Sequence, residues 1–282
     1  MFKYFISTKT FRYLSNCYLS RNDFLCLLRT NIVNMSNCKI IINILCLIFI
    51  AKASSDEGYR GSNNFDVLIF TQRWPQTVCY TWKASSPSHT CSLPKEHDEW
   101  TIHGIWPSQY HKVGPQFCNK SMPFKPDALK SLKGELQEKW IDVEYGRTSY
   151  SLWEHEWKKH GTCAVVLKQL NSEVKYFAEG LNLLAKYDMK NVLAKVNIVP
   201  GQKYGTNAIL NAIRKVLGKR GVVICRKNKN TGESYILEIR ICFNKMLQLM
   251  DCDGISEYPT NCDASELVTY PSIVPRYNVV QV

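Results

Sequence analysis

The sequence contains no apolar segment long enough to cross a bilayer and, beyond residue 60, no repeat, linker or low-complexity tract. A membrane-spanning helix needs about 20 mostly apolar residues. The most apolar segment here, residues 40–50, has only 11. The missing repeats and linkers exclude a solenoid and a string of small domains. We therefore expect one large globular domain after a short N-terminal region.

The sequence also lacks the spacings that are typical of protein metal sites. No two cysteines are separated by only two residues, so no zinc-binding cysteine pair is evident. His155 and Glu156 begin like the HExxH motif of zinc proteases, but the next histidine, His160, follows His155 by five residues instead of four. On an α-helix this step corresponds to about 140°, so the two rings are not expected to share an ion. The sequence predicts no metal and no cofactor.

The apolar segment at residues 40–50 has the features of a secretory signal peptide. It follows Lys39 and is followed by Ala51-Lys52-Ala53, a small-x-small cleavage site. We expect cleavage near Ala53 of a signal that starts at Met35. The chain then has three expected parts: an N-terminal extension, 1–34, which is an over-long gene model or a second targeting element; the signal peptide, 35–53; and a mature domain, 54–282.

The mature domain is mildly basic and rich in cysteine. The whole chain has 36 Lys/Arg and 24 Asp/Glu residues. Removing residues 1–53 takes away seven Lys/Arg and one acid, which leaves 29 Lys/Arg and 23 Asp/Glu residues. This excess suits a polyanionic ligand without identifying one. Four of the 12 cysteines lie in residues 1–53, and the remaining eight predict four disulfides in an oxidising compartment. Their spacing alone leaves the pairing open.

Hydrophobic periodicity predicts both helices and strands. Apolar residues at three- and four-residue steps predict helices over residues 126–140, 152–166, 172–187 and 206–217, with Ser151 as the cap of the second. Short β-rich runs predict strands over residues 67–70, 100–106, 222–225, 235–243 and 246–252. The expected fold class is α+β, with a central antiparallel β-sheet flanked by helices.

Two segments concentrate residues that are suited to catalysis: WTIHGIWP at residues 100–107 and WEHEWKKHGTC at residues 153–163. Helical neighbours in the second segment lie three or four residues apart and can adjoin on one surface. For any single residue, a solvated surface helix is the simpler interpretation. The two segments together favour an active site, whose candidate residues are His103, Trp106, His155, Glu156, Lys159 and His160.

Together with FTQRWPQTVC at residues 70–79, these segments resemble the active-site motifs of the ribonuclease T2 family in order and spacing. The resemblance extends over about residues 65–262. It implies the α+β architecture of that family and a secreted or lysosomal endoribonuclease with little base specificity. RNA would be the partner, with no metal, no obligatory protein partner and a monomeric chain. The alternative is a secreted glycoprotein that uses the same fold for binding, signalling or toxicity.

The resemblance also implies a role for each candidate residue. His160 would be the base and His103 the acid of a transphosphorylation, although two histidines also allow the reverse assignment. Lys159 with Glu156 would stabilise the transition state, and His155 would bind phosphate. Trp106 would stack on a base, with core packing as the alternative. Gln72 and Trp74 are weaker candidates for the neighbouring nucleotide, because a buried strand end is an equally good interpretation.

Further implications concern disulfides, glycosylation and base recognition. The family often has an acid directly after the Trp-Pro of the first motif, where this chain has Ser108, so base preference is left open. Asn119-Lys120-Ser121 is an acceptor sequence for N-linked glycosylation. By resemblance the disulfides are Cys79 with Cys91, Cys118 with Cys163, Cys225 with Cys262, and Cys242 with Cys252.

Overall fold

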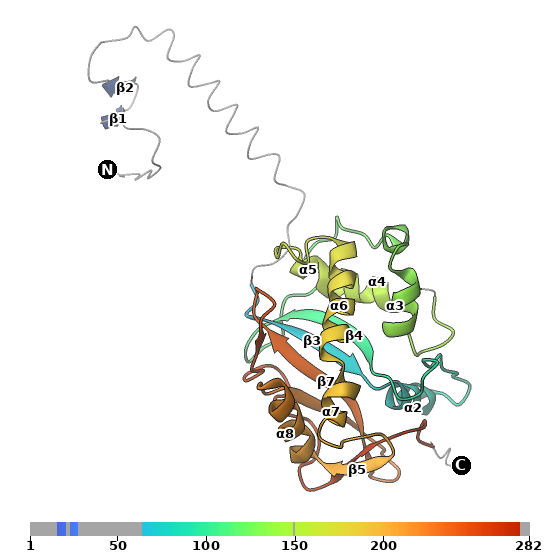
Figure 1. Cartoon of the computed structure of the whole chain (residues 1–282). Helices are drawn as coiled ribbons and strands as arrows, with labels where there is room; N and C mark the ends of the chain where they lie inside the picture. The colour runs from blue at the N-terminus through green and yellow to red at the C-terminus, as the bar shows by residue number, and fades with distance from the viewer. Residues whose placement is uncertain (1–15, 21–22, 28–63, 149, 277–282) are drawn as a thin grey trace. The chain divides into compact units, whose positions relative to one another are not determined.

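The computed structural model of the chain describes residues 16–20, 23–27, 64–148 and 150–276 (Figure 1). The expected signal peptide and most of the expected N-terminal extension lie outside these residues. The chain divides into two units, Met1–Gly58 and Tyr59–Val282. In the first unit, β1 (Asn16–Ser20) and β2 (Asp23–Leu27) pair antiparallel.

A seven-stranded sheet forms the centre of the second unit. Neighbouring strands along its path are β4, β3, β7, β9 and β5, while β6 and β8 also pair with β7. All these pairings are antiparallel except the short parallel one between β7 and β9. The expected α+β class is confirmed. The strands are β3 (Val67–Arg73), β4 (Thr101–Ser108), β5 (Gln202–Gly205), β6 (Val222–Lys227), β7 (Ser234–Phe243), β8 (Leu249–Met250) and β9 (Leu267–Tyr270).

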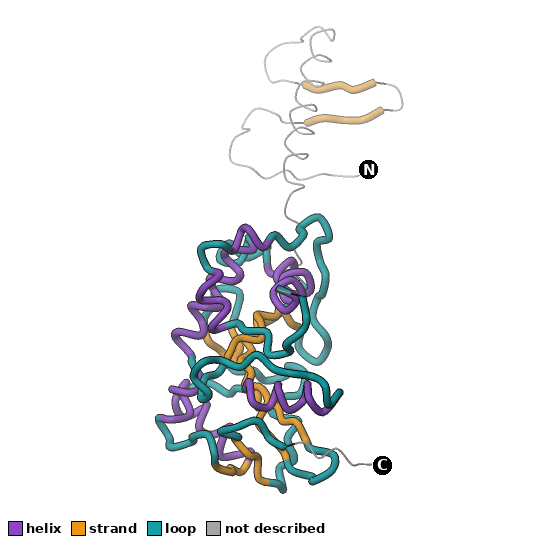
Figure 2. Tube along the Cα trace, turned by 90° about the vertical axis from the view of Figure 1, so that its right-hand side faces the viewer, coloured by secondary structure: helices purple, strands orange, loops and turns teal. Residues whose placement is uncertain are grey.

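Most helices gather on one side of this sheet, and loops cover much of the other side (Figure 2). In the part of the chain that the structure describes, no helix has the length and apolar composition needed to span a membrane. The helices are α2 (Pro75–Ser85), η2 (Pro126–Leu129), α3 (Lys133–Lys139), α4 (Ser151–Glu156), η3 (Trp157–Gly161), α5 (Thr162–Ala164), α6 (Glu173–Tyr187), α7 (Met189–Ala194) and α8 (Thr206–Leu217).

The helices expected over residues 172–187 and 206–217 are present as α6 and α8. The one expected over residues 126–140 is instead a 3₁₀ turn, η2, followed by α3. The strand expected over residues 246–252 contains only two paired residues, because the Asn244 side chain accepts backbone hydrogen bonds that hold a turn beside it. The sequence interpretation missed α2 and α7.

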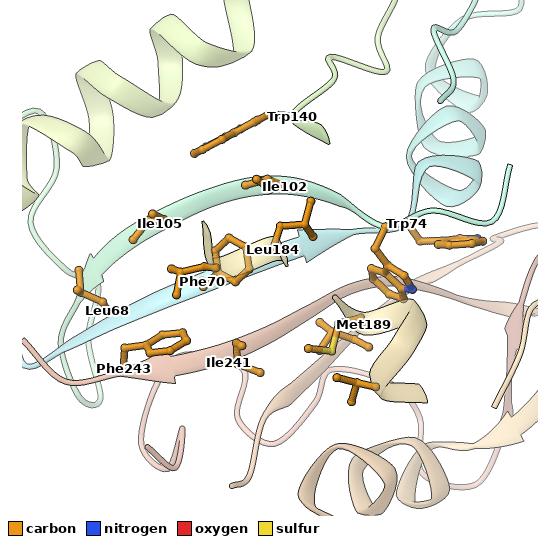
Figure 3. Close-up of a cluster of buried hydrophobic side chains, with 14 of the residues drawn as sticks. Leu68, Phe70, Trp74, Ile102, Ile105, Trp140, Leu184, Met189, Ile241 and Phe243 are labelled. Atoms are coloured by element: carbon orange, nitrogen blue, oxygen red, sulfur yellow. The ribbon is translucent and has the colours of Figure 1, made fainter. Parts of the chain in front are cut away.

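The main core fills the space between the sheet and the helices. Side chains from neighbouring strands meet on one face of the sheet, among them Phe70 of β3, Ile102 of β4 and Phe243 of β7 (Figure 3). Trp140 covers β4 from the helical side and is wholly buried. Burying large side chains across three adjacent strands fixes their register, and with it the positions of the polar residues beside them.

Four disulfides add covalent links to this core. They join the same cysteine pairs that the resemblance implies, namely Cys79–Cys91, Cys118–Cys163, Cys225–Cys262 and Cys242–Cys252. Cys163 lies on α5, so its bridge ties the end of the second motif to the loop between β4 and η2. Removing a native disulfide from a small secreted domain typically costs about 2–5 kcal/mol of stability.

Glu173, at the first turn of α6, makes the stability of the fold sensitive to pH. Burial raises the pKa of Glu173 to about 7, although the Lys125 backbone N–H donates to both carboxylate oxygens at 3.1 and 3.2 Å. The folded protein therefore keeps the Glu173 proton at pH values at which the unfolded chain has already released it. The stability that Glu173 contributes is fully present below about pH 4.5, the ordinary pKa of the side chain. It is lost as the pH rises toward about 7.

We expect Glu173→Gln to reduce the decline in melting temperature between pH 5 and pH 8, because glutamine cannot lose a proton. Thermal unfolding of the two proteins at both pH values measures the difference. Glu179→Gln, on an outer face of the same helix, is the control and should follow the original protein. An equal decline in all three proteins would contradict this assignment.

Candidate active site

His103 lies at a bulge in β4. Thr71 of β3 pairs with Gly104 and Gln72 pairs with Ile102, which leaves His103 as the extra residue. Such bulges commonly redirect a side chain beside an active site. The indole N–H of Trp140 donates to the His103 carbonyl at 2.9 Å, so the bulged backbone is also held from the helical side.

The second motif forms α4, the π-helical turn η3 and α5, instead of the continuous α-helix that was expected. The predicted cap is also wrong, because α4 begins at Ser151, whose hydroxyl donates to Asp142. A π-helical turn inserts one residue into the α-helical repeat, so the expected 140° separation of His155 and His160 does not apply. Their ring centroids lie 6.5 Å apart.

Glu156 connects the two motifs. Its carboxylate is almost completely buried and accepts a 2.8 Å hydrogen bond from the indole N–H of Trp106. The other carboxylate oxygen lies 3.8 Å from Nε2 of His103. Burial raises the pKa of Glu156, whereas the charge of His103 and the Trp106 hydrogen bond act in the opposite direction. Glu156 therefore joins the strand motif and the helix motif in one site.

The contact between the two motifs depends on the absence of a side chain at Gly104. A Cβ atom at this position would overlap both the Glu156 carboxylate and the Trp106 indole nitrogen. Gly104 thus lets the helix approach β4 closely enough for Glu156 to face His103. No side chain larger than hydrogen fits here without displacing one of these two residues.

His103 also contacts Glu238, a site residue that sequence reasoning missed. Nδ1 of His103 lies 2.6 Å from Oε1 of Glu238, which is on β7. Burial acts to raise the pKa of Glu238, but the charges of and hydrogen bonds from His103 and Arg240 outweigh it and lower the pKa to about 2. The sequence feature that could have identified Glu238 and Arg240 is the presence of two charged side chains at alternate positions of an otherwise apolar strand.

His160 lies in a different electrostatic environment. Its side chain is buried, and its Nδ1 has no hydrogen-bond partner among the residues that the structure describes. Burial lowers the pKa of His160 well below its ordinary value, and the positive charges of Lys159, His103 and His155 lower it further. Within the described part of the chain, no carboxylate is paired with this ring. The neutral form of His160 is therefore favoured.

Lys159 and His155 complete the group of polar side chains around His160. His155 is exposed, and burial of part of its ring together with the Lys159 charge lowers its pKa. Lys159 is half-buried and acts electrostatically on Glu156, His155 and His160. The site thus contains a cation that is electrostatically coupled to Glu156 and to two histidines.

Trp106 contacts both candidate catalytic histidines. Its ring centroid is 5.0 Å from that of His103, in an edge-on arrangement, and 5.3 Å from that of His160. The Arg240 guanidinium lies over the same indole ring, 5.4 Å from its centroid. Trp106 is half-buried and also packs against the core cluster that contains Val67 and Ile69, as the core-packing alternative expects.

Gln72 and Trp74 are not in the site, which corrects their assignment as substrate contacts. Both side chains are wholly buried. The Gln72 amide donates to the Tyr187 carbonyl and accepts from the Met189 N–H, so it bonds the backbone between α6 and α7. The Trp74 indole donates to the Pro271 carbonyl at 2.8 Å. Their hydrogen-bonding groups are used within the fold.

The sequence analysis also predicted no metal site, an acceptor asparagine at position 119 and a serine, Ser108, in place of an acid after the first motif. Among residues 64–148 and 150–276, no three His, Cys, Asp or Glu side chains are arranged to hold a metal ion. Asn119 accepts two hydrogen bonds from Ser121 through Oδ1. Ser108 is buried at the end of β4, where its carbonyl accepts from the Asp66 N–H.

Comparison with known proteins gives consistent matches. The Ribonuclease T2 family profile matches residues 65–252. Ribonuclease Oy of Magallana gigas is 35% identical over 214 residues, which cover 74% of this chain and 98% of that protein. Ribonuclease T2 of Homo sapiens is 33% identical over 224 residues, which cover 78% and 83%. A crystal structure of human RNase T2 aligns with a TM-score of 0.60 at 32% identity, covering 74% of this chain and 99% of that one.

Proposed function

Since the chain belongs to the ribonuclease T2 family, we propose that it is an endoribonuclease that cleaves single-stranded RNA through a 2′,3′-cyclic phosphate to 3′-phosphate ends. The observation that carries this proposal is that Trp106 contacts two histidines, with its ring centroid 5.0 Å from that of His103 and 5.3 Å from that of His160. Glu156 lies beside His103, and Lys159 acts electrostatically on His160. The scheme assigns no step to a metal ion.

RNA supplies its own nucleophile, the 2′-hydroxyl, so the protein needs only a base and an acid. In the first step the base takes the 2′-hydroxyl proton, O2′ bonds to phosphorus, and the P–O5′ bond breaks as the acid protonates O5′. In the second step the two groups exchange roles: one takes a proton from water, the water oxygen bonds to phosphorus, and the P–O2′ bond breaks as the other group protonates O2′. Imidazole titrates near pH 6.5, so one neutral and one protonated ring can coexist in mild acid.

The electrostatics of the two histidines support His160 as the base and His103 as the acid of the first step. Burial and neighbouring positive charges lower the pKa of His160, so its ring is neutral and able to accept a proton. His103 instead has a carboxylate beside each ring nitrogen, with Oε1 of Glu238 2.6 Å from Nδ1 and Oε1 of Glu156 3.8 Å from Nε2. The reverse assignment would place the proton on His160, for which the structure describes no carboxylate partner.

Lys159 is assigned to the negative charge that develops on the phosphate oxygens. We expect Lys159→Ala to lower kcat by about 10²–10³-fold, as removal of one transition-state donor does elsewhere. The matched control is Lys158→Ala, because the neighbouring Lys158 is exposed and pairs with Glu154, at 2.5 Å. Steady-state kinetics on RNA separates the two variants. Equal losses in both would contradict this role for Lys159.

We propose little base specificity because the site offers an aromatic ring on which a base can stack. Stacking on an aromatic ring is worth about 1–3 kcal/mol per base and tolerates any base. Trp106 is the aromatic residue placed between both histidines, and Ser108 offers no carboxylate for a specific base contact. His155, exposed beside His160, is assigned to a phosphate group of the substrate.

We also propose that residues 54–282 are the mature, secreted or lysosomal enzyme and that residues 35–53 are its signal peptide. Four disulfides support an oxidising compartment. Glycosylation of Asn119 is proposed for the same reason. The complete set of catalytic side chains comes from one chain, so the enzyme is proposed to act as a monomer.

An RNA substrate that lacks a single 2′-hydroxyl group tests the proposal. Two RNA oligonucleotides would be compared, identical except that one carries a single 2′-deoxynucleotide. The proposal expects cleavage at every accessible linkage except the one that follows the deoxynucleotide. Cleavage at that linkage would show that a water molecule or another group attacks phosphorus, and would overturn the transphosphorylation scheme.

A further inference from the structure

We propose that Glu238 is the positioning residue for His103, and that Arg240 and Glu257 hold Glu238 in place for this role. The inference rests on the proposed function, because it deals with the residue assigned as the acid. Glu238 lies 135 residues after His103, outside both histidine motifs. Its assignment comes from contacts that are formed only in the folded chain.

The backbone of Glu238 is fixed on both sides. It pairs with Arg73 of β3 and with Ile224 of β6, so it belongs to a central strand. Leu237 is the extra residue of a bulge opposite Ile224 and Cys225, directly before Glu238. His103 is likewise the extra residue of a bulge in β4. Two backbone irregularities therefore bring the imidazole and the carboxylate together.

The Glu238 carboxylate is itself held by charge-assisted hydrogen bonds. Its second oxygen, Oε2, accepts from Nε of Arg240 at 3.2 Å and from Nη2 at 2.9 Å. Nη1 of the same guanidinium donates to Glu257 at 2.7 Å. The guanidinium also lies over the Trp106 ring. Because Arg240 holds the Oε2 atom, the carboxylate is fixed with its other oxygen, Oε1, directed at His103.

The contact with Glu238 determines which ring nitrogen of His103 faces the substrate. A carboxylate only accepts hydrogen bonds, so Nδ1 of His103 carries a proton and donates it to Glu238. Nε2, which lies 3.8 Å from Oε1 of Glu156, is then the nitrogen that would face the leaving oxygen. An imidazole fixed in this way presents the reacting nitrogen in one orientation and one tautomer.

Several charged groups surround His103, and the inference concerns the one that contacts Nδ1. Glu156 faces the other ring nitrogen, at 3.8 Å. His155 and His160 of the α4 and η3 segment interact with His103 through space, and Arg240 of β7 contacts the Glu238 carboxylate.

Substitution of Glu238 tests the inference by kinetics. We expect Glu238→Ala to lower kcat about 10–100-fold with little change in KM, as loss of an orienting carboxylate does at other histidines. Glu238→Gln keeps the shape and an acceptor for the Nδ1–H of His103, so it should restore most of the kcat that Glu238→Ala loses. The control is Glu266→Gln, which removes an exposed carboxylate paired with Lys227.

A measurement without substrate separates this inference from the proposed function. Long-range ¹H–¹⁵N NMR of the His103 ring at pH 8 reports which nitrogen carries the proton. We expect Nδ1–H in the original protein and in Glu266→Gln, and a mixture of tautomers in Glu238→Ala. An unchanged Nδ1–H tautomer together with unchanged kcat in Glu238→Ala would overturn the inference. A fully folded original protein that does not cleave RNA would overturn the proposed function, while the tautomer would still decide the role of Glu238.

Discussion

Replacement of His160 by alanine is expected to lower kcat by about 10²–10⁴-fold, the largest loss of any single substitution considered for this protein. The reason is that general base catalysis contributes about this factor, and no other neutral imidazole lies in the same position. His155, the neighbouring histidine, is exposed, with its ring centroid 6.5 Å from that of His160. Single-turnover cleavage of a short RNA measures the loss.

The pH dependence sharpens this expectation. A base must be neutral to act, so activity rises with pH as His160 loses its proton. Because burial and the Lys159 charge lower the pKa of His160 well below its ordinary value, the acid limb should lie below pH 6.5 in the original protein. His97→Ala, which removes an exposed imidazole, is the control and should leave the rate and the profile unchanged. Activity of His160→Ala within tenfold of the original would refute the assignment.

Replacement of Gly104 by alanine is expected to lower kcat by about 10²-fold, although the change adds a single methyl group. That group would overlap the Glu156 carboxylate and the Trp106 indole nitrogen, so one of them must move. A displacement of about 1 Å in a catalytic arrangement costs a factor of this size. Kinetics on RNA, together with circular dichroism to confirm that the variant folds, measure the effect.

Gly134→Ala provides a matched control within the same chain. Gly134 lies in α3, where an added Cβ has no atom within 4 Å. Alanine is a better helix former than glycine, so this variant should be as active as the original protein and slightly more stable. If Gly104→Ala were as active as Gly134→Ala, the close approach of Glu156 to β4 would have no catalytic importance.

The residues of the two motifs could be predicted because each motif is continuous in the sequence. His103 and Trp106 lie on one strand, and Glu156, Lys159 and His160 lie on one helical segment. Their residue types and spacing are therefore visible before folding. The fold class, two of the helices and most strands were predictable for the same reason, since hydrophobic periodicity is a local property.

Glu238 could not be predicted from any local pattern that identifies a catalytic site. It reaches His103 through strand pairing between β3, β4 and β7, and sequence spacing does not encode such a contact. The π-helical turn was missed because periodicity assumes 3.6 residues per turn. Gln72 failed as a substrate contact because its polar groups bond the backbone between α6 and α7, a position that depends on tertiary packing.

The most direct test of the whole scheme is the chemical nature of the first product. The purified mature protein would be incubated with single-stranded RNA at pH 5 in the presence of EDTA, and the ends would be identified by ³¹P NMR and mass spectrometry. The two-histidine mechanism predicts 5′-hydroxyl ends and 2′,3′-cyclic phosphates that appear first and then decay to 3′-phosphates. Ends with 5′-phosphates, or cleavage that EDTA abolishes and an added divalent metal restores, would contradict it.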